Sequence, residues 1–338
     1  MKKSIIIVSV ICLSLISLLG CRGKSSSGVV TMNLSVPDPV DSYIHKAAVE
    51  FVQRVKEYSD NTININISAN GSLYGGDSSA GIKQLSSGAL DIVILATSLY
   101  GSFNPNFNII SVPFLYDNQQ QLVDFLNSDI GDSLMQSVSN MNISCVGKWT
   151  RSFRKITSSK SPINSPNDLK GMVLRVPNNS LYVLYFSAAG ATCTPMNFSE
   201  VYNALQLKTL DGQENPIDVP FSNKFWEVQK YISGTDHMAD AWLVGINSKK
   251  FESLTQAQKE AILRAGEEVQ QWNVDFIEKE DKTGLEVLTE NGMIYNEISS
   301  QNRQKFIDIA KGLYSDFSTL VGDADLFNKT IEFCGKNK

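Results

Sequence analysis

Strand patterns and helix patterns alternate along this 338-residue chain, and the alternation constrains its fold more than any other feature. Residues 29–39 resemble a strand that runs into a proline-rich turn, and residues 41–59 place apolar side chains at helical spacing. Residues 61–69 (NTININISA) alternate strictly between polar and apolar, as a half-buried strand does. After a helical segment at residues 78–88, the apolar run at residues 89–97 (ALDIVILAT) is typical of a buried parallel strand. This order predicts an α/β fold.

A second stretch of the chain repeats the same alternation. Strands are expected at residues 141–150, 172–177 (MVLRVP) and 192–196, and helices are expected over residues 178–190 and 197–209. A second α/β unit predicts a molecule of two lobes, which a chain of this length can build.

The segment 210–221 (LDGQENPIDVPF) follows the last of these helices and is polar at its centre. Its carboxylates, amides, glycine and proline are residues that turns favour, so we interpret it as a turn. The preceding helix is expected to begin at Asn197 and Glu200, which are spaced as a capping pair.

A long helix is expected in the C-terminal third of the chain. Thr255 and Gln258 are spaced as a capping box at its start. One apolar stripe then follows at steps of three and four residues: Ile262, Ala265, Val269, Trp272 and Phe276. A helix of this length predicts a brace between the two lobes.

The N-terminus has the pattern of a secretory signal. Lys2 and Lys3 precede the apolar run at residues 5–20, which predicts a signal peptide over residues 1–20. The alternative is an uncleaved N-terminal helix. The sequence Leu-Leu-Gly-Cys that ends at Cys21 resembles the bacterial lipobox, in which the cysteine becomes the lipidated first residue. Residues 21–28 are then a flexible tether that holds the body at a membrane surface.

Charge and cysteine content exclude several kinds of partner. Without Lys2 and Lys3 the chain has 28 basic and 35 acidic residues, and it has no basic run, so we expect no nucleic-acid partner. Cys145, Cys193 and Cys334 remain in the body, and their spacing does not name a disulfide. With only two histidines in the chain, we expect no metal site.

Motifs for catalysis are missing from the sequence. It has no G-x-S-x-G, no Walker loop, no H-E-x-x-H and no glycine-rich dinucleotide fingerprint after the first strand. We therefore expect a protein that is not an enzyme and that uses no cofactor.

Arg175 is the best candidate for ligand binding that the residues themselves suggest. It lies in an otherwise apolar strand, near the carboxyl end where α/β sheets place ligands. A guanidinium fork there can bind a carboxylate through two hydrogen bonds. The alternative is a salt bridge to an Asp or Glu of the protein.

Four other residues admit ordinary interpretations. Arg151 and Arg154 follow a strand in a basic loop, and such a loop is usually a solvated face. His237 has the setting of a loop histidine without a task, and Trp242 has the setting of a core residue.

Four motifs together resemble one known family. LKGMVLRVPNN, CTPMNFSEVYNALQ, LDGQENP and FWEVQKYISGTDH occur here in that order. The chain is similar, from about residue 30 to its C-terminus, to the DctP-like substrate-binding proteins of tripartite ATP-independent periplasmic (TRAP) transporters. The resemblance implies a periplasmic solute receptor that closes two α/β lobes on its ligand and delivers it to a membrane permease. Lobe I would comprise residues 29–151 and 241–278, and lobe II residues 152–240 and 279–338.

The resemblance also implies a set of site residues. Arg175 corresponds to the carboxylate-binding arginine of the family, and Arg154 to a second arginine. Asn215 corresponds to a ligand-contacting asparagine, with Asp211 and Glu214 holding its segment in place. Phe198 corresponds to the aromatic that floors the pocket in sialic-acid-binding members, Asn178 to an asparagine after R-V-P, and His237 to an occasional pocket histidine. Apart from the resemblance, we expect Trp242 to supply an apolar wall and His45 to be an alternative contact for hydroxyl groups.

Two departures from the family pattern bear on the ligand. Sialic-acid-binding members have a Glu and an Arg where this chain has Ala96 and Leu99. We therefore expect a smaller sugar acid, such as a hexuronate or an aldonate. A C4-dicarboxylate is the alternative, and Arg154 would then act as the second cation.

Two other classes of function stay open on the sequence. A periplasmic enzyme would need a nucleophile beside a base, and a ligand-sensing lipoprotein would need no permease. The ligand, the oligomeric state, the choice of inner or outer membrane and any disulfide are not named by the sequence.

Overall fold

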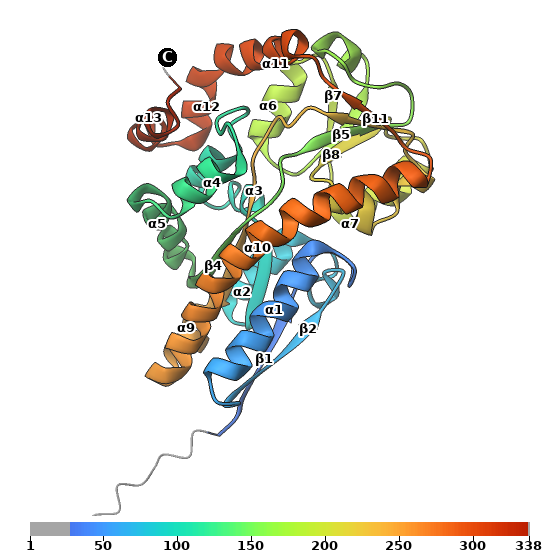
Figure 1. Cartoon of the computed structure of the whole chain (residues 1–338). Coiled ribbons are helices and arrows are strands. Elements are labelled where there is room, and N and C mark those ends of the chain that lie inside the picture. Colours follow the sequence, from blue (N-terminus) through green and yellow to red (C-terminus); the bar gives the residue numbers. More distant parts are fainter. Residues whose placement is uncertain (1–27, 337–338) are drawn as a thin grey trace, which may run out of the picture.

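The computed structural model describes residues 28–336, which form two β-sheets covered by helices (Figure 1). The first sheet has five strands in the order β2-β1-β3-β10-β4. Their bounds are β1 Val30–Ser35, β2 Ile63–Ser68, β3 Ile92–Ala96, β4 Ile143–Thr150 and β10 Ala241–Asn247. Strand β1 runs parallel to β2 and β3, whereas β10 runs antiparallel to β3 and β4.

The second sheet has six strands in the order β11-β9-β5-β8-β6-β7. Their bounds are β5 Lys155–Ser158, β6 Val173–Val176, β7 Thr192–Pro195, β8 Gly212–Asn215, β9 Tyr231–Gly234 and β11 Ile294–Glu297. Strand β6 runs parallel to β7 and β8, and β5 runs antiparallel to β8 and β9. The predicted α/β class is confirmed.

Helices of amphipathic sequence cover the sheets. Their bounds are α1 Tyr43–Tyr58, α2 Ser78–Ser87, α3 Thr97–Tyr100, α4 Gln119–Leu126, α5 Asp129–Gln136, α6 Ser180–Ala188, α7 Phe198–Gln206, α8 Asp218–Ser222, α9 Ser248–Glu252, α10 Gln256–Glu290, α11 Ser300–Gly312, α12 Tyr314–Val321 and α13 Ala324–Phe333. In α1, for example, Ile44, Ala48 and Phe51 are fully buried at helical spacing and join the core of the first sheet.

Two chain segments cross between the sheets side by side. Residues 151–154 lead from β4 to β5, and residues 235–240 lead from β9 back to β10. Arg154 N donates to Met238 O at 3.0 Å, and His237 N donates to Arg154 O at 3.2 Å. Because both crossings are hydrogen-bonded to each other, they form one narrow connection.

Helix α10 is the third connection, and its predicted capping box between Thr255 and Gln258 is confirmed. The helix packs against β4, α1 and α8, and Figure 1 shows it running past both lobes. Gly266 allows its close approach to β4, because a Cβ there would lie 1.7 Å from Val146 O.

The predicted apolar stripe of α10 holds only along the part that covers the first sheet. Trp272 and Phe276 are half-buried and stack on each other, with ring centroids 4.6 Å apart. Asn273 is buried instead, and its Nδ2 donates to Thr150 O at 2.7 Å. The stripe changes because the helix here lies against the polar backbone at the carboxyl end of β4.

The turn interpretation of residues 210–221 is wrong for the centre of that segment. Gly212–Asn215 form strand β8, and all four residues are buried. The glycine is required by packing, because a Cβ on Gly212 would lie 2.0 Å from Thr157 O in the neighbouring strand. The polar side chains are tolerated because they are hydrogen-bonded, as described below.

The expected capping pair at α7 is also wrong in its contacts. Asn197 occupies the N-cap position, but its side chain caps no backbone N–H. Its Oδ1 instead accepts a hydrogen bond from Asn178 Nδ2 at 3.1 Å.

The C-terminal helices pack across the molecule. Helix α12 contacts the 3₁₀ segment Pro105–Ser111 and α6, and α13 contacts the same segment and α5.

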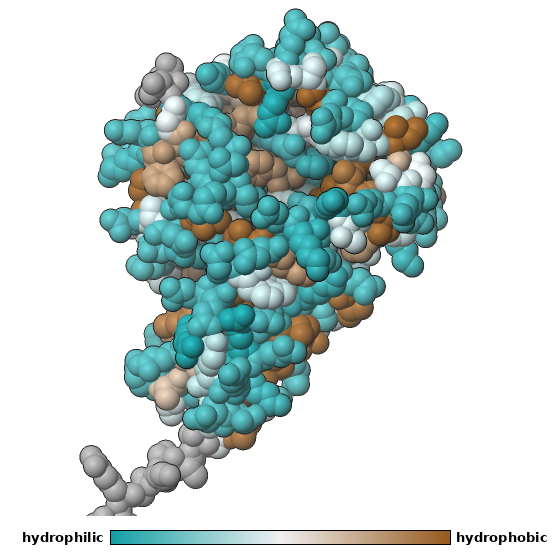
Figure 2. All heavy atoms as spheres, viewed as in Figure 1, coloured by the Kyte–Doolittle hydropathy of each residue, from teal (hydrophilic) through white to brown (hydrophobic). Residues whose placement is uncertain are grey.

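Cys145, Cys193 and Cys334 are free thiols. The face drawn in Figure 2 is largely hydrophilic, with hydrophobic residues scattered over it. Within residues 28–336, no helix combines the length and apolar character that a membrane crossing needs. The expected signal peptide, tether and lipidated Cys21 lie outside the described residues.

Candidate ligand-binding site

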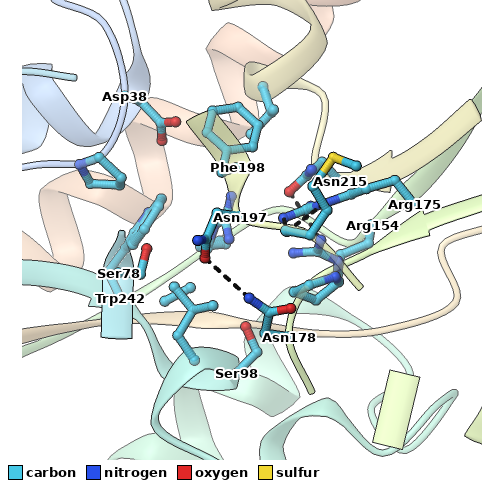
Figure 3. Close-up of a pocket in the computed structure, with 17 residues that line it drawn as sticks. Asp38, Ser78, Ser98, Arg154, Arg175, Asn178, Asn197, Phe198, Asn215 and Trp242 are labelled. Atoms are coloured by element: carbon cyan, nitrogen blue, oxygen red, sulfur yellow. Dashed lines mark hydrogen bonds between the residues drawn. The ribbon is translucent and has the colours of Figure 1, made fainter. Parts of the chain in front are cut away.

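A pocket lies where the carboxyl ends of parallel strands from both sheets meet (Figure 3). The lining residues include Asp38 after β1, Ser98 after β3, Arg175 and Asn178 at and after the end of β6, Phe198 after β7 and Asn215 at the end of β8. Trp242 of β10 and two arginines of the crossing segment complete the wall. The space measures about 540 Å³, a figure that includes open solvent.

Arg175 is buried in this wall without a carboxylate partner among the described residues. Its side chain is 3% exposed. Nε and Nη2 both donate to Met196 O, at 3.1 and 2.7 Å. A guanidinium has five N–H groups, so three remain without an acceptor from residues 28–336. Burial lowers the pKa of Arg175 to about 10, and the nearby Glu214 opposes this shift. The side chain is a desolvated cation whose unused donors face the pocket.

Arg154 has the opposite setting, because every nitrogen of its guanidinium has an acceptor. Nε and Nη2 donate to the two carboxylate oxygens of Glu214, and Nη1 donates to Asp240 Oδ2 at 3.2 Å. Burial would lower the pKa of Arg154, but Glu214 raises it well above its usual value. The pKa of Glu214 is lowered against its burial by the same arginine. Arg154 is therefore a neutralised member of a buried network.

The expectation that Arg151 and Arg154 form a solvated basic loop is wrong. The two side chains are 5% and 2% exposed. Arg151 lies with its Cζ 4.0 Å from the centre of the Trp242 ring, and its Nη1 donates to Asp240 Oδ2 at 3.1 Å. Both arginines are drawn inward because Asp240 and Glu214 lie buried beside the crossing segments.

Ion pairs neutralise two of the three buried arginines in the pocket wall. Arg151 and Arg154 pair with the buried carboxylates Glu214 and Asp240. Arg175 is the arginine without an ion-pair partner among residues 28–336, so it is the cation of the wall that is free to bind an anionic group.

Asn215 and Asn178 are held in place on this wall. Asn215 Oδ1 accepts from Arg154 Nη2 at 3.0 Å, and its Nδ2 donates to Gln213 Oε1 at 2.7 Å. Asn178 is exposed and donates to Asn197, as described above. Asp211 and Glu214 hold the segment as expected: Asp211 Oδ2 accepts from Val173 N at 2.9 Å.

Phe198 and Trp242 supply apolar surfaces to the pocket. The Phe198 ring centre is 5.9 Å from Arg175 Cζ, and Trp242 is 4% exposed. Both residues line the pocket next to an arginine, so their rings help to define the orientation of the guanidinium groups.

The two histidines do not line the pocket. His237 is buried behind it, where Nε2 lies 3.2 Å from Glu214 Oε2 and Nδ1 lies 2.7 Å from Thr235 Oγ1. Burial lowers the pKa of His237. His45 is a half-buried residue in the first turns of α1. His237 supports Glu214, and through it Arg154, from outside the ligand space.

Sequence reasoning missed Asp38, Arg151, Ser98 and Asn197 as lining residues. Asp38 had a usable signal, because it lies shortly after the carboxyl end of the parallel strand β1, Val30–Ser35. Within residues 28–336, no cluster of three His, Cys, Asp or Glu side chains is arranged to hold a metal ion.

A family model described as "Bacterial extracellular solute-binding protein, family 7" (DctP) matches residues 35–320. The chain belongs to this family. It is a TRAP solute receptor, a binding protein and not an enzyme, as its sequence predicts.

Relatives and solved structures agree with this family. The "2,3-diketo-L-gulonate-binding periplasmic protein YiaO" of Escherichia coli K12 is 29% identical over 264 residues, which are 78% of this receptor and 79% of that protein. The sugar acid binding protein DctPAm of Advenella mimigardefordensis, solved with galactonate, is 26% identical with a TM-score of 0.87 over 91% of this receptor and 99% of that chain. A TRAP solute-binding protein of Roseobacter denitrificans, solved with L-galactonate, is 28% identical with a TM-score of 0.80 over 89% of this receptor and 99% of that chain. The two-lobed receptor architecture is confirmed.

Proposed function

We propose that this TRAP receptor captures a sugar acid, such as a hexuronate or an aldonate, and delivers it to a TRAP permease. The observation that carries the proposal is the buried Arg175, whose three unused N–H groups face the pocket. A ligand carboxylate would accept two of them in parallel. Asn215, Asn178 and the rings of Phe198 and Trp242 would position the rest of the ligand.

The state of Arg154 supports a monocarboxylate over a C4-dicarboxylate. A second carboxylate would need a second free cation. The N–H groups of Arg154 already bind Glu214, Asp240 and Asn215, and Arg151 is ion-paired with Asp240. Breaking a buried ion pair to free one partner costs about 3–5 kcal/mol. Arg154 would therefore act as a scaffold for Asn215 and not as a second carboxylate site. The related proteins that bind galactonate and 2,3-diketo-L-gulonate support the same class of ligand.

Lobe closure would complete the site. The pocket takes residues from both sheets, and the lobes that we propose are residues 29–151 with 241–278 and residues 152–240 with 279–338. A ligand that contacts both lobes would stabilise the closed form. Closure would also exclude water, which strengthens the contact between Arg175 and a carboxylate.

The mature receptor would remain at a membrane. We propose that residues 1–20 are removed as a signal peptide, that Cys21 is lipidated and that residues 21–28 form the tether. The folded body would then work in the periplasm beside the permease.

A thermal-shift panel of sugar acids tests the proposal. Galactonate, gluconate, galacturonate and glucuronate would each be compared with the neutral sugars galactose and glucose at equal ionic strength. At a ligand concentration of roughly 100 times the dissociation constant, mass action stabilises the folded state by about 2.7 kcal/mol. We expect at least one acid to raise Tm by several degrees and the neutral sugars to leave it unchanged. Equal shifts with acids and neutral sugars, or no shift with any acid, would contradict the proposal.

A further inference from the structure

Asp38 is a buried carboxyl group in the pocket, and it takes no part in the carboxylate contact proposed for Arg175. Its side chain is 3% exposed and lines the pocket. None of the hydrogen bonds and ion pairs formed within residues 28–336 reaches either of its carboxylate oxygens. Its backbone, in contrast, is fixed: Asn70 N donates to Asp38 O at 3.0 Å, and Pro37 and Pro39 flank it. The group is rigidly placed and unpaired.

An unpaired buried carboxyl group is costly to keep. Burial raises the pKa of Asp38 to about 6, and Arg151 opposes that shift. A hydrogen-bond donor brought by a ligand would remove most of this cost, because it would replace the water that burial excludes. A hydroxyl group is such a donor.

Asp38 and Arg175 lie on opposite sides of the pocket. Figure 3 shows Asp38 at the upper left of the view and Arg175 at the right, with Phe198 and Asn197 between them. A ligand held by its carboxylate at Arg175 would thus extend toward Asp38 with its other end. That end would meet the Asp38 carboxyl group, beside an Arg151 guanidinium that is already ion-paired with Asp240.

We propose that Asp38 is a specificity-determining residue, which accepts hydrogen bonds from hydroxyl groups at the far end of the ligand and disfavours a second carboxylate there. The inference rests on the proposed function and narrows it to hydroxylated monocarboxylates. A ligand ammonium group fits less well, because the positively charged Arg151 guanidinium lines the same pocket, interacts with Asp38 and would repel the ammonium. A neutral hydroxyl group is not repelled by Arg151.

Matched pairs of acids isolate this contact. Galactonate and galactarate differ at the far end alone, where one has a hydroxymethyl group and the other a carboxylate. Gluconate and glucarate form a second pair. Isothermal titration calorimetry on the mature receptor gives the ratio of dissociation constants within each pair. For the wild type we expect the monocarboxylate of a pair to bind about tenfold or more tightly than the dicarboxylate, because like charges in contact cost several kcal/mol.

Asp38→Asn tests the residue directly, since the amide keeps the shape and removes the charge. We expect the ratio to fall by about tenfold, with weaker monocarboxylate binding and stronger dicarboxylate binding. Asp38→Ser removes the carboxyl group altogether and should lower the ratio in the same way. Asp41→Asn is the matched control, because Asp41 is an exposed residue in the same turn and makes no contact with the pocket; its ratio should equal that of the wild type.

The outcomes separate this inference from the proposed function. If the wild type binds monocarboxylates but both Asp38 variants keep its ratio, or if the wild type prefers the dicarboxylates, the role of Asp38 is overturned and the acid-binding function stands. If the wild type binds none of the four acids, nor any acid of the thermal-shift panel, the proposed function is overturned together with this inference.

Discussion

Arg175 and Arg154 lie in the wall of the same pocket, and their partners give them different properties. Arg154 donates to Glu214, Asp240 and Asn215, whereas Arg175 donates to a single backbone carbonyl. The sequence could place Arg175 near the end of a strand by a local rule. It could not show that Glu214, 60 residues away, neutralises Arg154. Partners distant in sequence decide which buried cation is free to bind a ligand.

Histidines illustrate the same limit at the scale of one residue. The family resemblance predicts His237 as a pocket residue, and the sequence offers His45 as an alternative, but His237 lies behind Glu214 and His45 lies on α1. A one-dimensional pattern locates a residue near a site, but the direction of its side chain depends on packing. Asn215, Asn178, Phe198 and Trp242 do line the pocket, and their direct role in binding stays a prediction.

Asp218 is a buried carboxyl group whose titration should affect stability. Burial raises its pKa to about 7, and Arg151 opposes the shift. Asp281 is likewise raised to about 7 and Asp38 to about 6, mainly by burial. Between about pH 4 and pH 7 these three carboxyl groups therefore bind more protons in the folded state than in the unfolded state. Their contribution to the free energy of unfolding should fall as pH rises through this window.

Urea unfolding at about pH 5 and about pH 8 measures this effect. For Asp218→Asn we expect a smaller difference between the two pH values and a higher stability than the wild type at the higher one. Asp308→Asn, at an exposed position on α11, is the control and should keep the wild-type difference. An Asp218→Asn variant with an unchanged pH dependence would show that Asp218 is ionised in the folded state at both pH values.

At the scale of elements, the sequence predicts strands that carry an apolar pattern and misses those that do not. Strands β1, β2, β3 and β6 lie where the alternation placed them. The sequence predicts a turn where strand β8 lies, because Gly212–Asn215 are polar and contain a glycine. Their burial is possible because two neighbouring residues form hydrogen bonds with their polar side chains. Arg154 of the crossing segment donates to Glu214, and Thr157 of β5 accepts from Gln213. Pattern rules assume apolar cores and do not detect a strand that is stabilised by a buried polar network.

Helix α10 depends on one glycine for its contact with the first sheet. A Cβ on Gly266 would lie 1.7 Å from Val146 O, so Gly266→Ala must push the helix away from β4. We expect a loss of about 1–3 kcal/mol in the free energy of unfolding, because overpacking of this kind costs that amount. Gly312→Ala on α11 is the control, since nothing lies within 4 Å of its Cβ position. Urea unfolding that gave Gly266→Ala the stability of the control would contradict the close contact.

At the scale of the whole molecule, three connections hold the two sheets around one pocket. Two hydrogen-bonded crossing segments and α10 link them, and both sheets contribute residues to the pocket. The α/β class followed from the alternation of strands and helices. The strand order, with β10 returning from the second half of the chain to the first sheet, did not follow from it, because no local signal encodes which distant strands pair.

The central claim is that the free guanidinium of Arg175 binds the carboxylate of a sugar acid. Isothermal titration calorimetry with the acid that gives the largest thermal shift tests it most directly, on the wild type, Arg175→Ala, Arg175→Lys and the exposed-residue control Arg264→Ala. We predict loss of measurable binding in Arg175→Ala with the cooperative unfolding transition kept, and weakened binding in Arg175→Lys, because an ammonium group lacks the two-pronged geometry of a guanidinium. Arg264→Ala should bind as the wild type does. An Arg175→Ala receptor that bound the acid with wild-type affinity would contradict the account.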